Sequence, residues 1–271
     1  MNDIERFLQE DLGDDGDITS DALFTSEQGH AHILAKEQCV IAGMEEVEMV
    51  FSKTGATVKK NVNDGDAIAP ATVIAEVDGS LRSILKGERL ALNFLGRMSG
   101  IATETRELVE CCSMHNPKVS IAATRKTTPG FRIYEKKAVM LGGGEPHRYG
   151  LYDAIMIKDN HICGVGSLKK AIEKVQSYLP TTPIEVEVET EEEALTAAQM
   201  HVAVIMLDNF SPEKGEKVAK NIKKIHNDIL IEFSGGITRA NIIDYASFAD
   251  RISLGCLTHS VKSKDFSLEI L

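Results

Sequence analysis

The sequence has no surplus of positive charge. Lysine and arginine together number 30 against 41 aspartates and glutamates, which gives a formal net charge of −11. Because such a surface repels the phosphates of DNA and RNA, we expect no nucleic-acid partner. The 271 residues are otherwise ordinary in composition, with 43% apolar and 26% charged side chains. This composition excludes disordered and fibrous proteins and leaves room for about two domains.

The sequence also lacks long apolar runs and paired cysteines. No stretch approaches the roughly 18 apolar residues of a membrane span, and residues 1–6 lack the pattern of a secretion signal. We therefore expect a cytoplasmic protein without a membrane partner. The five cysteines include no Cys-x-x-Cys pair, so neither a disulfide framework nor a zinc site is predicted.

Six short apolar runs follow one another from residue 118 onward, with space for a helix between most of them. The runs cover residues 119–123, 154–157, 184–188, 202–207, 229–233 and 251–254, and helices are expected at 168–179 and 191–200. This alternation is typical of a parallel sheet covered by helices, and six or more units favour closure into a barrel. A doubly wound open sheet is the alternative, but the Gly-x-Gly-x-x-Gly turn that it usually carries is missing.

The N-terminal part has a different pattern. Strands are expected at 31–42, 56–60 and 72–77, followed by a long helix at about 83–112. That helix carries Leu85, Leu92, Leu95 and Met98 on one apolar side, which must be buried. The sequence therefore predicts an α+β domain over residues 1–110 and an α/β barrel over residues 111–260.

Positively charged side chains follow the first two runs of the expected barrel. In parallel barrels the working groups lie on the loops that leave the carboxyl ends of the strands. Arg125 and Lys126 follow the first run and Lys158 follows the second, while His147 and Arg148 lie in the glycine-rich segment between them. Because arginine can bind a carboxylate through two hydrogen bonds and lysine can face phosphate oxygens, this set predicts a pocket for a small anion.

Carboxylates follow on the next two runs. Glu185, Glu187 and Glu189 alternate with valines and share one face of their strand, which in a barrel is the interior. Three buried carboxylates are costly unless cations or a metal lie among them, whereas an edge strand with one wet face would leave them in water. With Asp208 after the next run, Glu187 could hold Mg²⁺.

Glycines follow the last two runs. Ser234, Gly235 and Gly236 are expected to open a helix, and Gly255 follows the last run. Barrels commonly bind a phosphate through backbone N–H groups at this place, so these residues predict a phosphate site. A tight turn between strand and helix is the simpler interpretation of either glycine alone.

These residues lie in segments that closely resemble the quinolinate phosphoribosyltransferase family. The segments cover residues 10–13, 92–101, 124–130, 135–139, 142–151, 157–161, 185–189, 206–209, 234–237 and 257–260. The likeness extends over nearly the whole chain. It implies the fold of a type II phosphoribosyltransferase, in which an N-terminal α+β open sandwich domain, joined by the C-terminal tail 261–271, precedes an α/β barrel.

The resemblance also implies an activity. Enzymes of this family are pentosyltransferases that join quinolinate to phosphoribosyl pyrophosphate, giving nicotinate mononucleotide, pyrophosphate and CO₂ in de novo NAD biosynthesis. The implied ligands of the quinolinate carboxylates are Arg125, His147, Arg148 and Lys158. Arg97 would join them from the neighbouring subunit of a homodimer or a larger assembly such as a hexamer.

Roles for the remaining residues follow from the same resemblance. Lys126 and Lys158 would face pyrophosphate, and the catalytic set would comprise Lys126, Lys158, Glu187 and Asp208. The last two would serve Mg²⁺ and the ribose hydroxyls, and the 5′-phosphate would lie on Ser234, Gly235, Gly236 and Gly255. Two departures concern the pocket rim: Pro146 stands where many bacterial relatives have Asn, and Ala123 where an Asp often stands.

Three other functions remain open at this point. A molybdenum-transport-associated branch shares the fold, although it lacks the run that stands here at residues 158–161. A barrel lyase could form a Schiff base on Lys158. A non-catalytic sensor of phosphorylated metabolites would bind ligand without turnover.

Overall fold

The computed structural model describes residues 3–271. Residues 1 and 2 belong to the expected N-terminal domain and to the segment 1–6 that was compared with a secretion signal, and they lie outside the described residues. The chain forms two compact units. The N-terminal unit comprises the residues up to Arg106 with Tyr134–Gly143 and Ser260–Leu271, and the barrel unit comprises Glu107–Ile133 and Gly144–His259. Helix α4 (Leu81–Ser113) contributes residues to both.

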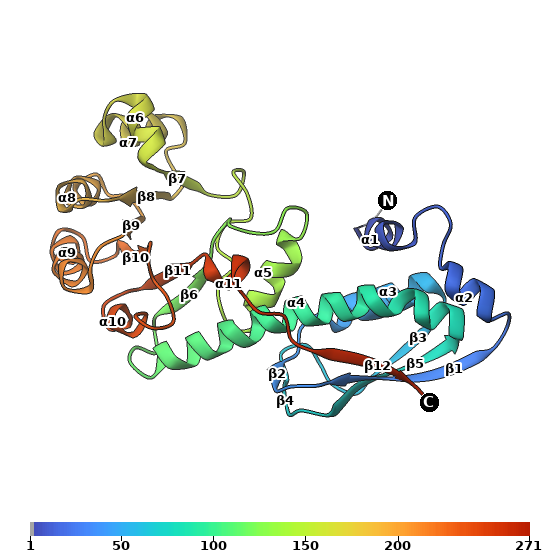
Figure 1. Ribbon diagram of the computed structural model, residues 1–271. Helices are drawn as coiled ribbons and strands as arrows, with labels where there is room; N and C mark the ends of the chain where they lie inside the picture. The colour runs from blue at the N-terminus through green and yellow to red at the C-terminus, as the bar shows by residue number, and fades with distance from the viewer. Residues whose placement is uncertain (1–2) are drawn as a thin grey trace. The chain divides into compact units, whose positions relative to one another are not determined.

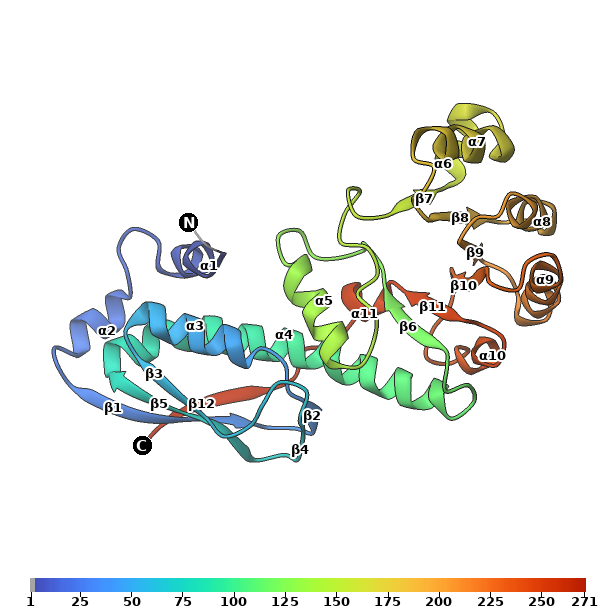
Figure 2. The same ribbon diagram turned by 180° about the vertical axis from the view of Figure 1, so that it is seen from behind.

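The N-terminal unit is built on an antiparallel sheet. Its strand order is β12 (Phe266–Ile270), β1 (Gln28–Ala35), β5 (Thr72–Ser80) and β3 (Thr57–Lys60), and β2 (Cys39–Val40) pairs separately with β4 (Ala67–Ile68). Alternate residues of β1 are buried, as the period of two in a strand requires. Helices α3 (Met44–Thr54) and α4 lie over one face of this sheet in both views (Figures 1 and 2). The C-terminal tail is thus a strand of this unit.

Three further helices complete the unit: α1 (Asp3–Leu12), α2 (Ile18–Leu23) and most of α5 (Arg132–Leu141). The apolar side predicted for the long helix is buried at Leu92, Leu95 and Met98. The prediction was wrong for Leu85, which is only half-buried, whereas the preceding Ile84 is fully buried. A straight helix has 3.6 residues per turn, so a contact stripe drifts around it over 33 residues.

The barrel unit contains six parallel strands in the order β6-β11-β10-β9-β8-β7. Their bounds are β6 (Ser120–Ala123), β7 (Ile155–Ile157), β8 (Ile184–Val188), β9 (Val204–Asp208), β10 (Leu230–Ser234) and β11 (Arg251–Leu254). The predicted α/β class is confirmed, with each strand within two residues of its apolar run. Within residues 3–271, however, no ladder of hydrogen bonds joins β6 to β7. The segment between these two strands forms one isolated bridge to β6, from Glu145 to Ala122.

The helices that connect the strands from β7 to β11 lie outside the arc that these strands form (Figure 1). They are α6 (Asp159–Val165), α7 (Leu168–Tyr178), α8 (Glu191–Gln199), α9 (Pro212–Ile225) and α10 (Ile243–Ala246). Helix α11 (Cys256–His259) follows the last strand, β11. Side-chain caps begin three of these helices: Ser167, Thr190 and Ser211 each accept a backbone N–H of the first turn. Thr190 and Ser211 stand in the loops that leave β8 and β9, whereas Ser167 follows α6. No helix within residues 3–271 is both long and apolar enough to cross a bilayer.

Candidate active site

Arg125 and Arg148 form the cationic part of the site. Arg148 is 8% exposed, and its pKa is lowered by burial and then by the positive charge of Arg125. The Nε of Arg125 is itself buried and makes no hydrogen bond within residues 3–271. Two neighbouring guanidinium groups, one with an unused buried donor, are costly unless an anion joins them. The structure therefore brings these two predicted ligands together.

Lys158 and Glu187 lie at the carboxyl ends of neighbouring strands, β7 and β8. The Nζ of Lys158 donates a hydrogen bond to Oε2 of Glu187. The side chain of Lys158 remains 37% exposed, whereas that of Glu187 is 17% exposed. This pair joins one predicted cation to one predicted carboxylate at the edge where a substrate would enter.

Asp208 ends the next strand, β9, and belongs to the same electrostatic group. Its pKa is raised, first by burial and then by the negative charge of Glu187, while Lys158 and Lys126 oppose the shift. Its Oδ2 accepts a hydrogen bond of 2.6 Å from Nδ2 of Asn209. The four predicted catalytic side chains are thus electrostatically coupled. The carboxylates Glu187 and Asp208 are of the type that suits Mg²⁺.

The expectation that Glu185, Glu187 and Glu189 are all buried was wrong. Glu185 is 6% exposed, Glu187 is half-buried and Glu189 is exposed. Burial decreases along the strand because β8 ends at Val188, and Glu189 already lies in the loop before α8.

The glycine segment after β10 lies against Asp208. Gly235 and Gly236 have φ angles of 78° and 64°, which glycine adopts at little cost. A Cβ on Gly235 would lie 2.4 Å from Oδ1 of Asn209 and 2.6 Å from Oδ1 of Asp208. The predicted helix start at Ser234 was wrong, because turns follow β10 and α10 begins only at Ile243. No helix N-terminus therefore lies at Gly235 and Gly236.

Gly255 lies beside Lys126. A Cβ on Gly255 would approach both Cδ of Lys126 and Nε2 of His259 to 2.9 Å. The hydroxyl of Thr258 donates a 2.7 Å hydrogen bond to the carbonyl oxygen of Lys126, which ties α11 to the loop after β6. This arrangement joins the first and last strand ends, and His259 is a neighbour that sequence reasoning had missed.

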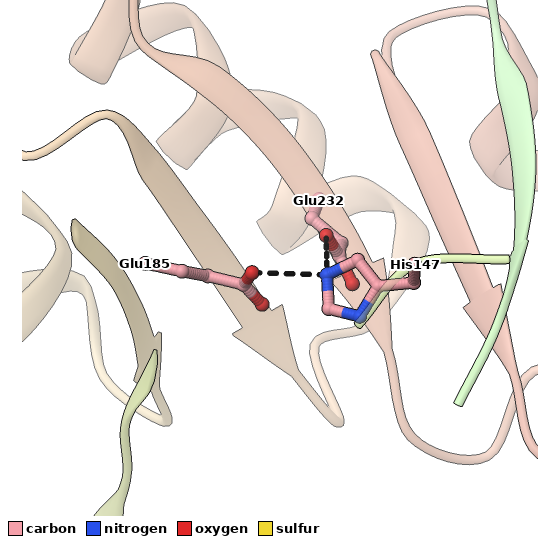
Figure 3. A group of neighbouring side chains, drawn as sticks. All are labelled: His147, Glu185 and Glu232. Atoms are coloured by element: carbon pink, nitrogen blue, oxygen red, sulfur yellow. Dashed lines mark hydrogen bonds and ion pairs between the residues drawn. The ribbon is translucent and has the colours of Figure 1, made fainter. Parts of the chain in front are cut away.

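His147 lies deeper in the barrel unit. Its Nε2 is 3.0 Å from Oε2 of Glu185 and 3.9 Å from Oε2 of Glu232 (Figure 3). Together with Arg148, Glu185 and Arg251 it lines a cavity of about 300 Å³ at the amino ends of β7–β9. The ligand atoms of His147, Glu185 and Glu232 lie within 4.8 Å of one another.

Sequence reasoning also missed the polar residues around His147. Glu232 is fully buried and accepts hydrogen bonds from Oγ of Ser253 and from Nη1 of Arg251. The signal was present, since Glu232 stands between Ile231 and Phe233 on an apolar strand, where an inward position is filled by a charged side chain.

Arg97 lies on α4 in the N-terminal unit. Its Nη2 donates a 2.7 Å hydrogen bond to Oε1 of the fully buried Glu135, and its Nη1 donates to the carbonyl oxygen of Val261 at 3.2 Å. These contacts hold the guanidinium within its own unit. The role of Arg97 in a neighbouring subunit stays a prediction.

A parallel α/β unit with cations, carboxylates and glycines at its strand ends defines an enzyme class that handles small anionic substrates. Comparison with known proteins is more specific. The family model "Quinolinate phosphoribosyl transferase, C-terminal domain" matches residues 101–269, and the corresponding N-terminal domain model matches residues 17–99. The chain belongs to this family.

Its relatives cover almost all of its length. The probable nicotinate-nucleotide pyrophosphorylase [carboxylating] of Archaeoglobus fulgidus is 42% identical over 94% of this chain and 98% of its own length. The protein of that name from Bacillus subtilis is 42% identical over 98% of this chain and 92% of its own. The crystal structure of NadC from Streptococcus pyogenes is 40% identical, with a TM-score of 0.92 over 99% of this chain and 95% of that one.

Proposed function

We infer that this chain is a pentosyltransferase that converts quinolinate and phosphoribosyl pyrophosphate to nicotinate mononucleotide, pyrophosphate and CO₂ in NAD biosynthesis, as the names of its relatives indicate. One observation carries the inference: an acidic molecule places the half-buried Arg125, whose buried Nε has an unused hydrogen, near the buried Arg148. Quinolinate has two carboxylates on one ring, and such a dianion suits two arginines.

Arg125 and Arg148 would bind these carboxylates. Each arginine can offer two parallel hydrogen bonds, so the pair fixes both the position and the plane of the pyridine ring. His147 adjoins Arg148 in the chain and would bind from the same side, while Lys158 would reach the ring from the end of β7.

Lys126 and Lys158 would face the pyrophosphate. Phosphoribosyl pyrophosphate carries its charge on phosphate oxygens, for which lysine is a suitable point charge. Gly235, Gly236 and Gly255, with Ser234, would hold the 5′-phosphate, because bare backbone lets N–H groups approach it closely.

Glu187 and Asp208 would hold Mg²⁺ and the ribose hydroxyls. Burial and mutual repulsion make a bare pair of carboxylates costly, as the raised pKa of Asp208 indicates, so a cation between them is favourable. Mg²⁺ commonly combines one or two carboxylates with substrate phosphates. When bound, it would neutralise charge on the departing pyrophosphate.

The order in which bonds break and form follows from where charge develops. As the bond between the ribose carbon and pyrophosphate breaks, Lys126 stabilises the leaving anion. The pyridine nitrogen then forms the new bond to that carbon and becomes a pyridinium. The bond to the adjacent carboxylate next breaks and CO₂ leaves. The electron pair stays on the ring carbon, where the positive nitrogen stabilises it, until that carbon takes a proton from water. The arginines align two anionic reactants against their mutual repulsion.

The assembly and location are part of the same proposal. Arg97 would complete the quinolinate site from a second chain, so a homodimer would be the smallest active form, and the cytoplasm would be its location. Neither a membrane nor a nucleic acid is required as a partner.

Release of labelled CO₂ tests the activity. Purified protein is mixed with quinolinate labelled in the carboxylate next to the ring nitrogen, phosphoribosyl pyrophosphate and Mg²⁺. We expect label release and nicotinate mononucleotide in equal amounts, and neither when phosphoribosyl pyrophosphate is omitted. Absence of both products from folded protein would refute the proposed function.

A further inference from the structure

The backbone of His147 is in an unusual conformation. Its φ angle is 52°, in the left-handed region that residues with a side chain rarely adopt. Such a residue costs of order 1–3 kcal/mol and persists only when its surroundings fix it. Two hydrogen bonds hold the chain just before it: Glu145 N to the Ile121 carbonyl at 2.8 Å, and Ala123 N to the Glu145 carbonyl at 2.9 Å.

Glu185 holds the side chain of His147 from the neighbouring strand. Its Oε2 is 3.0 Å from Nε2 of the imidazole, and its side chain is 7% exposed. When Glu185 is ionised its carboxylate only accepts hydrogen bonds, and the hydrogen of this contact then lies on Nε2. The other ring nitrogen, Nδ1, makes no hydrogen bond within residues 3–271. It donates to a ligand carboxylate in the imidazolium form, in which both ring nitrogens carry a hydrogen.

Glu232 closes the arrangement on a second side. Its Oε2 lies 3.9 Å from Nε2 of His147 and accepts a 3.0 Å hydrogen bond from Arg251. Arg251 in turn donates from Nε to Oε2 of Glu145, two residues before His147, at 2.9 Å. Figure 3 shows both carboxylates directed at the same nitrogen of the imidazole, Nε2. The loop that carries His147 is therefore bound at both its backbone and its side chain.

This polar cluster is costly as a purely structural device. Oε1 of Glu185 is buried and makes no hydrogen bond within the part of the chain that the structure describes. A well-packed apolar core at the same place would often be as stable or more stable. The cluster has an evident use, however, because the charge of Glu185 also acts on Arg148, the residue next to His147.

We propose that Glu185 is a positioning residue, which anchors His147 through Nε2 and so sets the His147–Arg148 pair for the carboxylates of quinolinate. This inference rests on the proposed function, because it assumes that the pair binds quinolinate. In this proposal Glu185 acts through His147 and not on the substrate directly. Glu232 approaches the same ring nitrogen, Nε2.

The first test observes the imidazole and needs no turnover. Protein labelled with ¹⁵N in its histidines is examined by NMR, and the His147 signal is assigned by its loss in His147→Gln. We expect Nε2 to carry a slowly exchanging hydrogen in the unaltered protein. Glu185→Ala should abolish that slow exchange, whereas Glu185→Gln should keep it, because the amide oxygen still accepts.

The second test measures both substrates. Glu185→Ala should raise the KM for quinolinate about tenfold, the loss expected when one orienting hydrogen bond of about 1.4 kcal/mol disappears. The KM for phosphoribosyl pyrophosphate should not change, and Glu185→Gln should restore most of the quinolinate affinity. Glu192→Gln, an exposed carboxylate on α8, is the matched control and should leave every value unchanged.

The outcomes separate this inference from the proposed function. An Nε2 without hydrogen in the unaltered protein would overturn the inference without any variant. Equal increases in both KM values with a lower melting temperature would also overturn it, because they indicate a merely structural role. If the NMR results are as expected but the unaltered protein releases no CO₂ from quinolinate, the hydrogen bond between Glu185 and Nε2 of His147 is confirmed and the proposed function is refuted.

Discussion

Burial and then the charge of Arg125 lower the pKa of Arg148, and so the two guanidinium groups lie within electrostatic reach in a partly buried space. Like charges repel at such a place, and a dianion between them would turn repulsion into attraction. The predictions for the substrate site follow from this relationship.

Arg125→Ala should chiefly weaken quinolinate binding. The change removes charge-assisted hydrogen bonds to one carboxylate, so we expect the dissociation constant for quinolinate to rise about 10- to 100-fold. Isothermal titration calorimetry measures it, with phosphoribosyl pyrophosphate as the internal control. If quinolinate affinity survives while phosphoribosyl pyrophosphate affinity falls, the two subsites are assigned the wrong way round.

Lys126→Ala should slow turnover. The ammonium group would stabilise charge that develops on the leaving pyrophosphate, and loss of one such donor typically lowers kcat about 100- to 1,000-fold. Steady-state kinetics at saturating concentrations of both substrates give kcat directly. An effect confined to the KM for quinolinate would remove the leaving-group role.

The barrel strands were predictable from sequence because their interiors are apolar. β8 and β11 coincide with the predicted runs, since turn residues bound both ends of each run. The number of units favoured closure into a barrel, but sequence did not show how the first strand and the second would meet. The segment that joins them contains Pro146 and contributes one bridge to β6, from Glu145 to Ala122.

Arg125, Lys126, Lys158 and Asp208 were found because each follows an apolar run. The surroundings of His147 were not, because its partners Glu185, Glu232 and Arg251 come from three different strands. Sequence shows that a charged side chain faces the interior of the sheet, but only the register and the order of the strands show which of these side chains contact one another.

Gly235→Ala should destabilise the chain and disturb Asp208. The new Cβ would lie 2.6 Å from Oδ1 of Asp208 at a φ of 78°, so we expect a loss of about 2 kcal/mol or more in unfolding free energy. Gly164→Ala is the control, because its Cβ would meet nothing within 4 Å inside α6. That control should gain about 0.5–1 kcal/mol. Urea denaturation compares them, and equal stability of the two variants would contradict the packing described.

Two buried thiols should make stability depend on alkaline pH. Burial raises the pKa of Cys39 and of Cys112 from 9.0 to about 11. Between these values the unfolded chain loses protons that the folded chain keeps, so unfolding becomes easier as pH rises from about 9 to about 11. Cys112→Ala should reduce this loss in urea denaturation at pH 8 and 10.5, whereas Cys163→Ala, at an exposed thiol, should not. Identical pH profiles for Cys112→Ala and the unaltered protein would contradict the assigned burial.

Mixing inactive chains tests whether Arg97 acts from a neighbouring subunit. If it does, a dimer of one Arg97→Ala chain and one Lys126→Ala chain contains one complete site, so random exchange of subunits should restore about a quarter of the original activity. Unfolding and refolding the two variants together produces the mixture. Arg125→Ala mixed with Lys126→Ala is the control, because both residues follow β6 in the same chain and no complete site can form. Activity that stays absent in the first mixture, with mixed dimers present by mass spectrometry, would place Arg97 within its own chain's site, and an Arg97→Ala chain that is active by itself would place Arg97 outside the site.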